Sequence, residues 1–254
     1  MMAFTKLLKN NFLKLPIRVL RQRPFKPSHF RIFMGDISSP FRRMPKDIHD
    51  FSGTGSVPDH SLLHLKAAMD WLCFAHDVNN DGGVAFQYSF SKGWGASYPE
   101  TTGYIIPTFF DYHKYSGQPE YKDRAIRMAK WLLSLQWPSG AFPGLMIDHP
   151  DPKPSIFNTG QIMFGLMRTY KETGEDVYLD SVVKSANWLV TMQDQKDGAW
   201  RQFACNDCPH TYYTRVAWAL LELYQLTSEQ SYKQSAIKNL DWAMNNQTET
   251  GWYM

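Results

Sequence analysis

The stretch that decides the fold runs from Trp131 to Phe142 and reads Trp-Leu-Leu-Ser-Leu-Gln-Trp-Pro-Ser-Gly-Ala-Phe. The same marks, a Trp, then a Gln, and then a Gly followed closely by an aromatic residue, return from Trp188 to Trp200 and from Trp242 to Trp252. A further Trp, Trp71, lies at a similar spacing before the first of them. Because tryptophan is a rare residue, its return at about 56 residues indicates an internal repeat.

Each repeat predicts two helices. Residues 178–192 place apolar side chains on one face and polar ones off it, as an outer helix with a solvent side would. Residues 160–167 and 216–224 are apolar nearly all round, which is typical of a helix enclosed by others. A hairpin cannot bury its own apolar face, so neighbouring hairpins must stack. The sequence therefore predicts an all-α array of about four hairpins in a repeat domain at residues 59–254.

The repeat also predicts two finer features. The four repeat tryptophans are expected in the core, where their size and apolar rings favour burial. Thr102, Thr159 and Thr214 open the inner helices and are expected to be N-caps.

The repeat resembles the α/α-toroid proteins from about residue 59 to 254. The turns that follow Gln136 and Gln193 resemble the Gln/Trp repeat of terpene cyclases. The hairpin lengths and the long polar loops are more similar to the six-hairpin sugar-processing enzymes, such as unsaturated glucuronyl hydrolases. Residues 97–104 also resemble bacterial proteins associated with polysaccharide production. The resemblance implies a toroid and a carbohydrate substrate.

The length bears on closure of the array. A toroid of six or seven hairpins needs roughly 340–400 residues at this period, whereas the sequence has 254. Either the sequence is a truncated toroid, which we favour, or the array stays open. An open array would cover its last apolar face with the N-terminal residues or another subunit, so a homo-oligomer is also expected as an alternative.

Composition excludes several classes of protein. With 43% hydrophobic and 15% aromatic residues the chain is globular, and no apolar run is long enough to cross a membrane. Residues 1–35 carry eight Lys and Arg and no acid, so the remainder has a net charge of −5 against +3 for the whole. We interpret residues 1–58 as a basic N-terminal arm, with residues 1–35 able to contact an anionic membrane. The modest total charge argues against nucleic acid as a partner.

Cysteines and metal motifs are sparse. Three cysteines cannot form a disulfide framework, and the basic arm lacks the features of a signal peptide. We therefore expect a cytoplasmic protein, peripheral to a membrane if the arm binds one. The pair at Cys205 and Cys208 lacks a second ligand pair for zinc, and the calcium-like loop at residues 77–82 has Tyr88 in place of the final Glu. The sequence predicts no metal and no other cofactor.

The connections between hairpins are long, and those within hairpins are short. Repeated geometry should place all the long loops at one end of the array, together with the N-termini of the inner helices, whose positive dipole ends favour an anionic ligand. Aromatic and charged side chains in these loops suit a sugar, which stacks on rings and is held by polar groups. The expected substrate-binding residues are Trp94, Tyr98, His149, Asn158, Trp200, Arg201, Tyr212 and Arg215.

Three residues, Glu100, Asp148 and His210, are candidates for catalysis, with Tyr212 as an alternative to His210. Glycoside hydrolysis needs two carboxyl groups, one protonated and one ionised, and Glu100 and Asp148 precede neighbouring inner helices at similar distances. A lyase or epimerase would use His210 or Tyr212 as the base. We therefore expect a protein that acts on an acidic oligo- or polysaccharide as hydrolase, lyase or epimerase. The alternatives are a glycan-binding scaffold without catalysis and, less favoured because an Asp-x-Asp-Asp motif is absent, a terpene-cyclase-like enzyme.

Overall fold

The structure is a computed structural model that describes residues 61–253. Its contacts divide the chain into two units, Met1–Leu62 with Ser89–Gly93, and Leu63–Tyr88 with Trp94–Met254. The second unit, called the repeat unit below, holds nearly all of the described residues. The basic arm, its boundary at residue 58 and its membrane contact lie outside the described residues.

The described residues are mostly helical, as the sequence predicts. Three complete helical hairpins follow one single helix, α4, which contains Trp71 and so takes the place of an outer helix. The predicted fourth hairpin is thus represented by α4 alone among residues 61–253. The helices are α4 (Ser61–Asp77), α5 (Pro99–Ser116), α6 (Pro119–Leu135), α7 (Ile156–Thr173), α8 (Asp176–Met192), α9 (Thr214–Thr227) and α10 (Gln230–Asn245), with the short strands β1 (Tyr88–Ser89) and β2 (Gly93–Trp94) and the 3-10 turns η1 (Cys205–Asp207) and η2 (Thr211–Tyr213).

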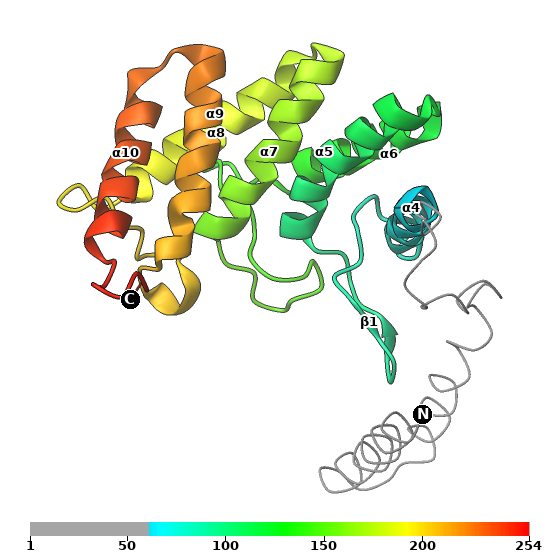
Figure 1. Ribbon diagram of the computed structural model, residues 1–254, viewed down its shortest axis with the longest axis horizontal. Coiled ribbons are helices and arrows are strands. Elements are labelled where there is room, and N and C mark those ends of the chain that lie inside the picture. The colour runs from blue at the N-terminus through cyan, green and yellow to red at the C-terminus, as the bar shows by residue number, and fades with distance from the viewer. Residues whose placement is uncertain (1–60, 254) are drawn as a thin grey trace, which may run out of the picture. The chain divides into compact units, whose positions relative to one another are not determined.

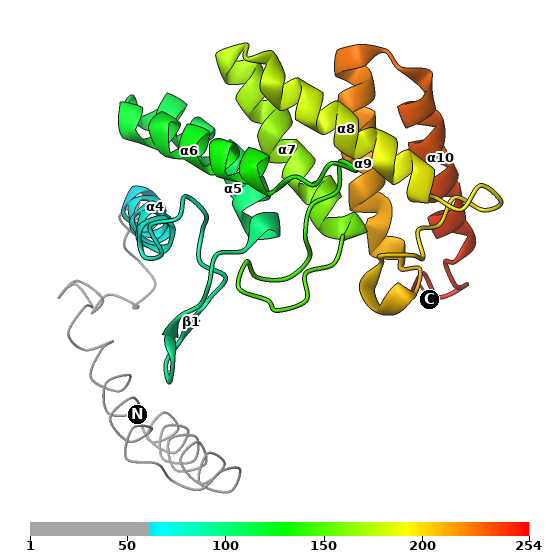
Figure 2. The ribbon, with the colours of Figure 1, turned by 180° about the vertical axis from the view of Figure 1, so that it is seen from behind.

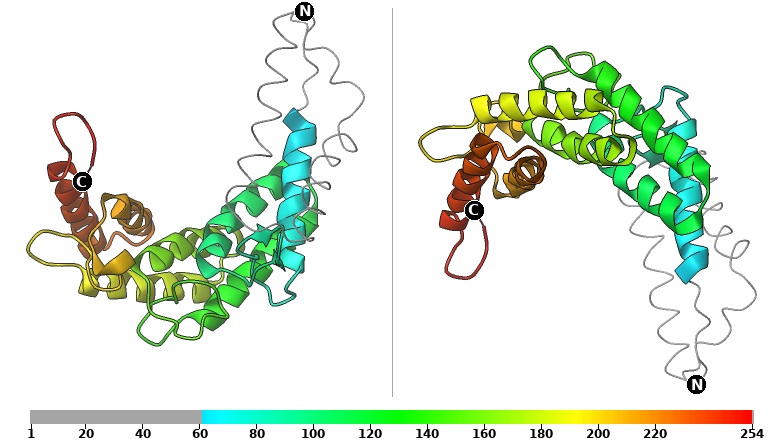
Figure 3. Two further views of the ribbon diagram at one scale, coloured as in Figure 1. Left: turned by 90° about the horizontal axis from the view of Figure 1, so that it is seen from below. Right: turned by 90° about the horizontal axis from the view of Figure 1, so that it is seen from above.

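The hairpins of the repeat unit lie side by side in chain order (Figures 1 and 2). Their first helices, α5, α7 and α9, pack against one another and form an inner row, whereas α6, α8 and α10 form an outer row with fewer mutual contacts. Seen along the hairpins, the two rows curve, with the inner row on the concave side (Figure 3). The predicted division into inner and outer helices is confirmed.

Glycines set the close spacing of the inner row. A Cβ atom on Gly103 would lie 2.6 Å from Cα of Ile162, and one on Gly160 would lie 2.9 Å from Cγ2 of Val216. Such distances leave no room for a side chain between neighbouring inner helices. This packing explains why two of the three inner helices carry Gly after the Thr that ends their first turn.

The threonines before these glycines are not N-caps. Oγ1 of Thr102 donates to the carbonyl of Tyr98 and accepts from the amide of Val84, at 2.8 and 2.9 Å. Thr159 makes the same pair of bonds to Ser155 and Phe142, at 2.7 and 3.0 Å. Each threonine lies one turn inside its helix and ties the preceding loop to it, so the N-cap prediction was wrong for these two residues. In α7 the cap is Ser155.

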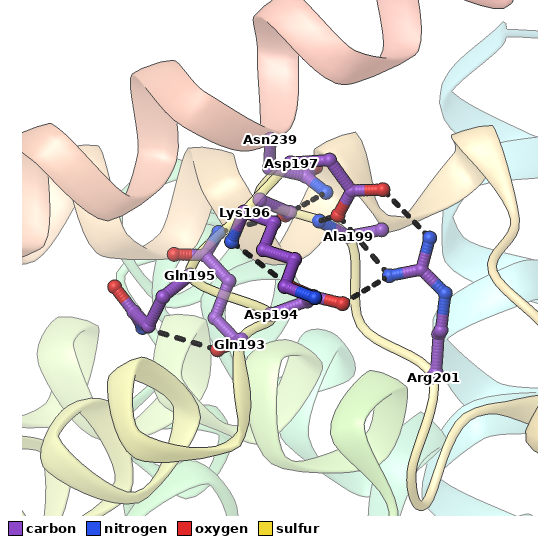
Figure 4. Close-up of polar contacts among 9 residues, drawn as sticks. Gln193, Asp194, Gln195, Lys196, Asp197, Ala199, Arg201 and Asn239 are labelled. Atoms are coloured by element: carbon purple, nitrogen blue, oxygen red, sulfur yellow. Dashed lines mark hydrogen bonds and ion pairs between the residues drawn. The ribbon is translucent and has the colours of Figure 1, made fainter.

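A glutamine directly after α6 and another after α8 join each of these repeats to the next. Gln193 donates from Nε2 to the carbonyls of Gly198 and Ser235, at 2.8 and 2.9 Å, and its Oε1 accepts from the Ser235 hydroxyl at 2.7 Å. Asn239, one turn along α10, donates to Gly198 as well (Figure 4). We call this arrangement the glutamine bridge. It ties the turn after α8 to the following outer helix, α10.

The preceding repeat has the same bridge. Gln136 donates to the carbonyls of Gly140 and Ser181, at 3.1 and 2.8 Å, and accepts from the Ser181 hydroxyl at 2.9 Å. Gly140 has a φ of +95°, and a Cβ there would collide with the Lys184 carbonyl. The turn therefore needs glycine both for its left-handed backbone and for its contact with α8.

In the first repeat a histidine takes the place of the glutamine. His76 lies five residues after Trp71, as Gln136 does after Trp131, and it hydrogen-bonds to the backbone of Gly82. Its Nδ1 lies 3.2 Å from Nη1 of Arg124, which occupies the position of Ser181 in α6. Because arginine is always a donor, Nδ1 is the acceptor and His76 is neutral.

The bridge is incomplete in the last repeat. Gln247 is exposed, and its Nε2 donates to the carbonyl of Gly251, in its own turn, at 3.1 Å. No outer helix follows α10 among residues 61–253. Gln247 therefore reproduces the turn without the contact between repeats.

The repeat tryptophans divide in the same way. Trp131 and Trp188 are buried, each 8% exposed, whereas Trp71 is 53% exposed and Trp242 is partly buried. The prediction that all four lie in the core is right for the middle pair and wrong for Trp71. Trp71 lies in α4, at one end of the described array, with Trp94 and Tyr88 as its ring contacts.

The glutamine bridge predicts a difference between equivalent residues. Replacing Gln193 with Ala removes two donated hydrogen bonds and the acceptor of the buried Ser235 hydroxyl, so we expect the free energy of unfolding to fall by about 2–3 kcal/mol. The matched control Gln247→Ala should cost less than about 0.5 kcal/mol, because its side chain is exposed. Urea unfolding followed by circular dichroism measures both. Equal losses in the two variants would contradict the bridge.

His76 predicts a pH dependence of stability. Burial, then the cations Arg127 and Arg124, lower the pKa of His76 below its ordinary value of 6.5, while Asp77 opposes them. The unfolded chain therefore binds a proton more readily, and the free energy of unfolding should decrease as pH falls below 6.5. The variant His76→Gln copies the other repeats and should flatten this decrease. Urea titrations between pH 7.5 and pH 5 test this, and parallel profiles for both proteins would refute it.

Candidate functional site

The long loops lie at one end of the repeat unit, where the inner helices begin (Figure 1). They span residues 78–98, 136–155 and 193–213, whereas the connections within hairpins are two residues each. Backbone bridges brace the first two loops, from Ala85 to Ser97 and from Pro143 to Pro154. The expectation of a single loop end is confirmed, and the candidate site is built on it.

A cavity of about 580 Å³ opens among these loops and the first turns of α5 and α7. Five of the predicted site residues line it, which are Tyr98, Glu100, His149, Asn158 and Tyr212. The loops of two successive repeats supply most of the remaining lining, including Phe157, Asp151, Lys153, Phe203, Asp207 and Tyr213. Residues distant in the sequence are thus brought together in one aromatic and acidic cavity.

Glu100 is the cavity carboxyl whose protonation is most altered. It lies in the first turn of α5, is partly buried, and hydrogen-bonds to the side chain of Tyr98. Burial raises the pKa of Glu100 above 4.5, because the charged form loses hydration, while the Tyr98 hydroxyl and the Arg215 cation partly offset that rise. Glu100 can therefore keep a proton at a higher pH than an exposed carboxyl.

Tyr98 links Glu100 to α7. Burial and the neighbouring Glu100 raise the pKa of Tyr98, and a hydrogen bond from Asn158 opposes the rise. The Asn158 side chain is buried, 4% exposed, and its Nδ2 donates to the Pro143 carbonyl at 3.1 Å. Its backbone N–H donates to the Ser155 hydroxyl, the N-cap of α7, at 3.2 Å. These bonds fix Asn158, which in turn fixes the Tyr98 hydroxyl against Glu100.

An aromatic wall faces these polar groups. Tyr212 is 45% exposed, stacks on Tyr213 at 4.8 Å between ring centroids, and meets Phe157 edge to face at 5.2 Å. His210 stacks on Tyr212 at 5.1 Å but does not line the cavity. Its Nε2 lies 3.1 Å from the carbonyl of Cys205. The stack holds Tyr212 in place, and its exposed ring offers a surface for a sugar.

Several predicted site residues lie elsewhere. Asp148 is exposed and outside the cavity lining, so it does not share the cavity with Glu100. Trp200 is 1% exposed and donates from its indole to the Leu189 carbonyl, which leaves no ring face for a sugar. Trp94 packs against Trp71 and Phe74. These placements follow from local packing that the spacing of residues alone did not reveal.

Arg201 is also outside the cavity, and its cation is already paired. It binds Asp194 at 2.9 Å and Asp197 at 2.6 Å, close to the Gln193 turn (Figure 4). Arg215, in the first turn of α9, lies near enough to Glu100 to lower its pKa but lines a different cavity. His149 does line the loop cavity, where Nδ1 accepts from the amide of Asp151 at 3.2 Å.

Two further carboxyl groups, Asp151 and Asp207, line the cavity with Glu100, and neither is among the catalytic residues predicted from the sequence. Asp151 lies 3.6 Å from Lys153, both largely exposed. Asp207 accepts from the backbone amide of Phe203 at 3.2 Å and is in no ion pair among residues 61–253. Asp207 comes from a tight turn with left-handed backbone at Asn206 and Asp207. Only the folded path of this turn, which the sequence does not specify, brings Asp207 to the cavity.

The candidate metal motifs have other surroundings. Cys205 and Cys208 are exposed free thiols at the η1 turn. Asp81 accepts from the amide of Gly83 and from Ser97, and Asp77 pairs with Arg124. Within the part of the chain that the structure describes, no group of three metal-ligating side chains is found. No helix of that part is long and apolar enough to cross a membrane.

One family model matches part of the chain. Residues 147–251 match the model of the β-L-arabinofuranosidase GH127 catalytic domain. The matched segment contains the second long loop from Ile147 onward, the third loop and the helices between and after them. No curated protein matches the sequence.

Solved structures share the fold. A GH76 α-mannanase of Bacteroides thetaiotaomicron has a TM-score of 0.59 and 14% identity, over 74% of this chain and 53% of its own. An unsaturated glucuronyl hydrolase specific for heparin has a TM-score of 0.59 and 17% identity, over 74% of this chain and 49% of its own. A family 76 glycoside hydrolase from a bovine strain of B. thetaiotaomicron has a TM-score of 0.52 and 17% identity, over 63% and 37%.

These likenesses confirm the predicted α/α-toroid fold. The helical hairpins superpose on those of toroid glycosidases in spite of low identity. The chain spans about half the length of the first two solved structures that it matches. The turns after Gln136 and Gln193, which resemble the Gln/Trp repeat of terpene cyclases, belong to these same helical hairpins.

The contact between Tyr98 and Glu100 can be tested directly. Replacing Tyr98 with Phe removes a donor to the carboxylate, so the pKa of Glu100 should rise further. Tyr104→Phe is the matched control, because burial and the charge of Glu100 act on Tyr104 without a hydrogen bond between them. NMR titration of ¹³C-labelled glutamate carboxyls measures the change. A pKa that falls or stays constant in Tyr98→Phe would refute the contact.

Proposed function

We propose that the loop cavity binds a sugar unit of an oligo- or polysaccharide and that Glu100 is the proton donor for cleavage of its glycosidic bond. The observation that carries the proposal is a partly buried carboxyl with a raised pKa in a cavity lined by aromatic rings. The likeness of the fold to toroid glycosidases supports the same class of activity. The proposal narrows the three predicted reaction types to hydrolysis.

Hydrolysis divides the work between two carboxyl groups. Glu100 in its protonated form would donate to the leaving oxygen as the bond from the anomeric carbon to that oxygen breaks. In an inverting reaction an ionised carboxylate would remove a proton from the water that attacks the anomeric carbon. In a retaining reaction the carboxylate would itself attack that carbon as the leaving oxygen departs, and water deprotonated by Glu100 would then hydrolyse the glycosyl ester and free the carboxylate. We assign this second role to Asp207 in place of Asp148, because Asp207 lines the cavity and Asp148 does not.

The remaining cavity residues have binding roles in this proposal. Tyr212 offers a ring face for the apolar side of the sugar, while Tyr98 and Asn158 orient Glu100. His149 is placed at the rim to contact sugar hydroxyls. His210 would act as a positioning residue by stacking on Tyr212, because its ring does not line the cavity. Elimination and epimerisation are disfavoured because His210, one predicted base, does not line the cavity, and burial raises the pKa of Tyr212, the other, which makes its basic form scarce.

Other expectations from the sequence stay predictions. A cytoplasmic location, with residues 1–35 against an anionic membrane, rests on the eight basic residues there. Assembly into a homo-oligomer rests on the repeat pattern of the sequence alone. The non-catalytic alternative, a glycan-binding scaffold, uses the same cavity and is separated from the hydrolase by the assay below.

Turnover by variants tests the proposed role of Glu100. The substrates are aryl β-L-arabinofuranoside, aryl α-mannoside and an unsaturated heparin disaccharide. On a substrate cleaved by the wild type, Glu100→Gln should lower kcat/KM by about a hundredfold or more, because it removes the transferable proton. Asp148→Asn, the matched control, should retain activity within about twofold.

The pH profile sharpens the same test. The wild-type kcat/KM should fall on the alkaline side at a pH above 4.5, as Glu100 loses its proton, and Glu100→Gln should lack that limb. Full activity in Glu100→Gln would overturn the assignment. Saturable sugar binding in calorimetry with no product from any of the three substrates would favour the scaffold instead.

A further inference from the structure

A second cavity, of about 370 Å³, lies among the inner helices alone. Its lining comes from α5, α7 and α9, without a contribution from the long loops. Helical spacing relates it to the loop cavity. On α5, Glu100 lines the loop cavity and Tyr104, one turn further along, lines the second cavity. On α7, Phe157 lines the loop cavity and Phe164, two turns further along, lines the second cavity. The two cavities therefore follow each other along the same inner-helix faces.

The second cavity is basic, in contrast to the first. Three cations, Arg168, Lys171 and Arg215, line it with one carboxylate, Glu222. Arg168 is neutralised by Asp111 at 2.6 Å and Glu172 at 2.8 Å, and Lys171 lies 3.8 Å from Glu222. Arg215 is in no ion pair among the residues that the structure describes. It is the cation of this cavity whose charge remains available to a ligand.

Arg215 is held in place by a buried amide. Its Nε donates to Oε1 of Gln161 at 3.0 Å, and Gln161 is 1% exposed. The Nε2 atom of Gln161 has no hydrogen-bond partner among the described residues. A buried side-chain amide whose NH2 group has no acceptor lowers the stability of the fold. The hydrogen bond by which Gln161 holds the Arg215 guanidinium gives a reason for a glutamine at this position. The terminal nitrogens of Arg215 stay free to form a forked contact with an anion.

An aromatic surface adjoins the cation. Trp218 is 49% exposed, packs on Phe164 at 4.7 Å between ring centroids, and lies 5.7 Å below the Arg215 guanidinium. Its indole donates to Glu222 at 3.1 Å, which fixes the orientation of the ring. A fixed and half-exposed ring beside an unpaired guanidinium matches a sugar ring that carries a negative group.

We propose that this second cavity binds an anionic group, a carboxylate or sulfate, on the glycan, with Arg215 as the anion contact and Trp218 as the stacking surface. The inference rests on the proposed function, because it assigns the neighbouring unit of the same glycan to the second cavity. It names the substrate class as acidic. The acidic lining of the loop cavity would then take the reacting unit, and the basic cavity would take the charged one.

Binding of matched glycan pairs tests the anion. The probes are a hyaluronan tetrasaccharide with its carboxyl-reduced form, and a sulfated galactan tetrasaccharide with its desulfated form. In calorimetry at low salt, at least one acidic probe should bind about tenfold more tightly than its neutral form, and the difference should shrink as salt rises. The two pairs distinguish a carboxylate from a sulfate. Equal affinity within both pairs, or binding of none of the four, would overturn the proposal.

Variants locate that binding. Arg215→Gln should weaken the preferred acidic probe about tenfold, while Arg215→Lys, which keeps the charge and loses the fork, should lie between it and the wild type. Arg127→Gln makes the same change at an exposed arginine outside this cavity and should leave affinity unchanged. Trp218→Ala should weaken both members of a pair, whereas Trp252→Ala, at a 78% exposed ring, should not.

The outcomes separate this inference from the proposed hydrolysis. Anion-dependent binding that persists in Glu100→Gln, together with an absence of product from the wild type, would support the subsite and refute hydrolysis. Turnover without any effect of Arg215→Gln on affinity would support hydrolysis and refute the subsite. Equal effects of Arg215→Gln and Arg127→Gln would show a general charge effect and would likewise refute it.

Discussion

The glutamine bridge is the interaction on which the array depends. Gln136 and Gln193, after α6 and α8, each bind both their own turn and the next outer helix, and His76 does so at the end of α4. Each glutamine adds a second donor to the carbonyl of its glycine turn, beside Ser185 or Asn239, and accepts from a serine hydroxyl of the next helix. The bridge therefore fixes the spacing of the outer row, as close glycine contacts fix that of the inner row. Between them they set the curvature that brings the long loops together.

The substitutions within the bridge show which of its parts are required. His76 and Arg124 replace glutamine and serine in the first repeat, yet the histidine still bonds to the glycine turn and to the next helix. The turn glycine is kept in every repeat with positive φ, from Gly82 to Gly251. Side-chain chemistry can vary as long as a donor and an acceptor are paired. The backbone conformation cannot vary, because another residue would be strained at this positive φ, and at Gly140 and Gly198 its Cβ would also collide with the next outer helix.

Sequence reasoning recovered the fold because the fold is periodic. A repeat of about 56 residues with apolar faces at helical spacing leaves few arrangements, and the toroid follows from stacking. Tyr98, Glu100, Asn158 and Tyr212, which the same reasoning selected, line one cavity, because they lie at or near the starts of inner helices, where the repeat fixes position. It missed Asp207, whose place depends on a left-handed turn within a loop of no regular structure. Trp200 and Arg201 illustrate the opposite error, since residues suited to a sugar were already engaged within the protein.

Arg215 departs from the repeat, because the equivalent positions of the two preceding inner helices hold Gly103 and Gly160. Gly103 and Gly160 are required because the next inner helix lies against them, at Ile162 and Val216. The equivalent position of α9 carries the long cationic side chain of Arg215 in place of glycine. Gln161, in the helix before, holds that side chain by accepting a hydrogen bond from its Nε. From there Arg215 lowers the pKa of Glu100 on one side and stands over Trp218 on the other. The position that holds glycine in α5 and α7 thus supplies, in α9, a cation that acts on both cavities.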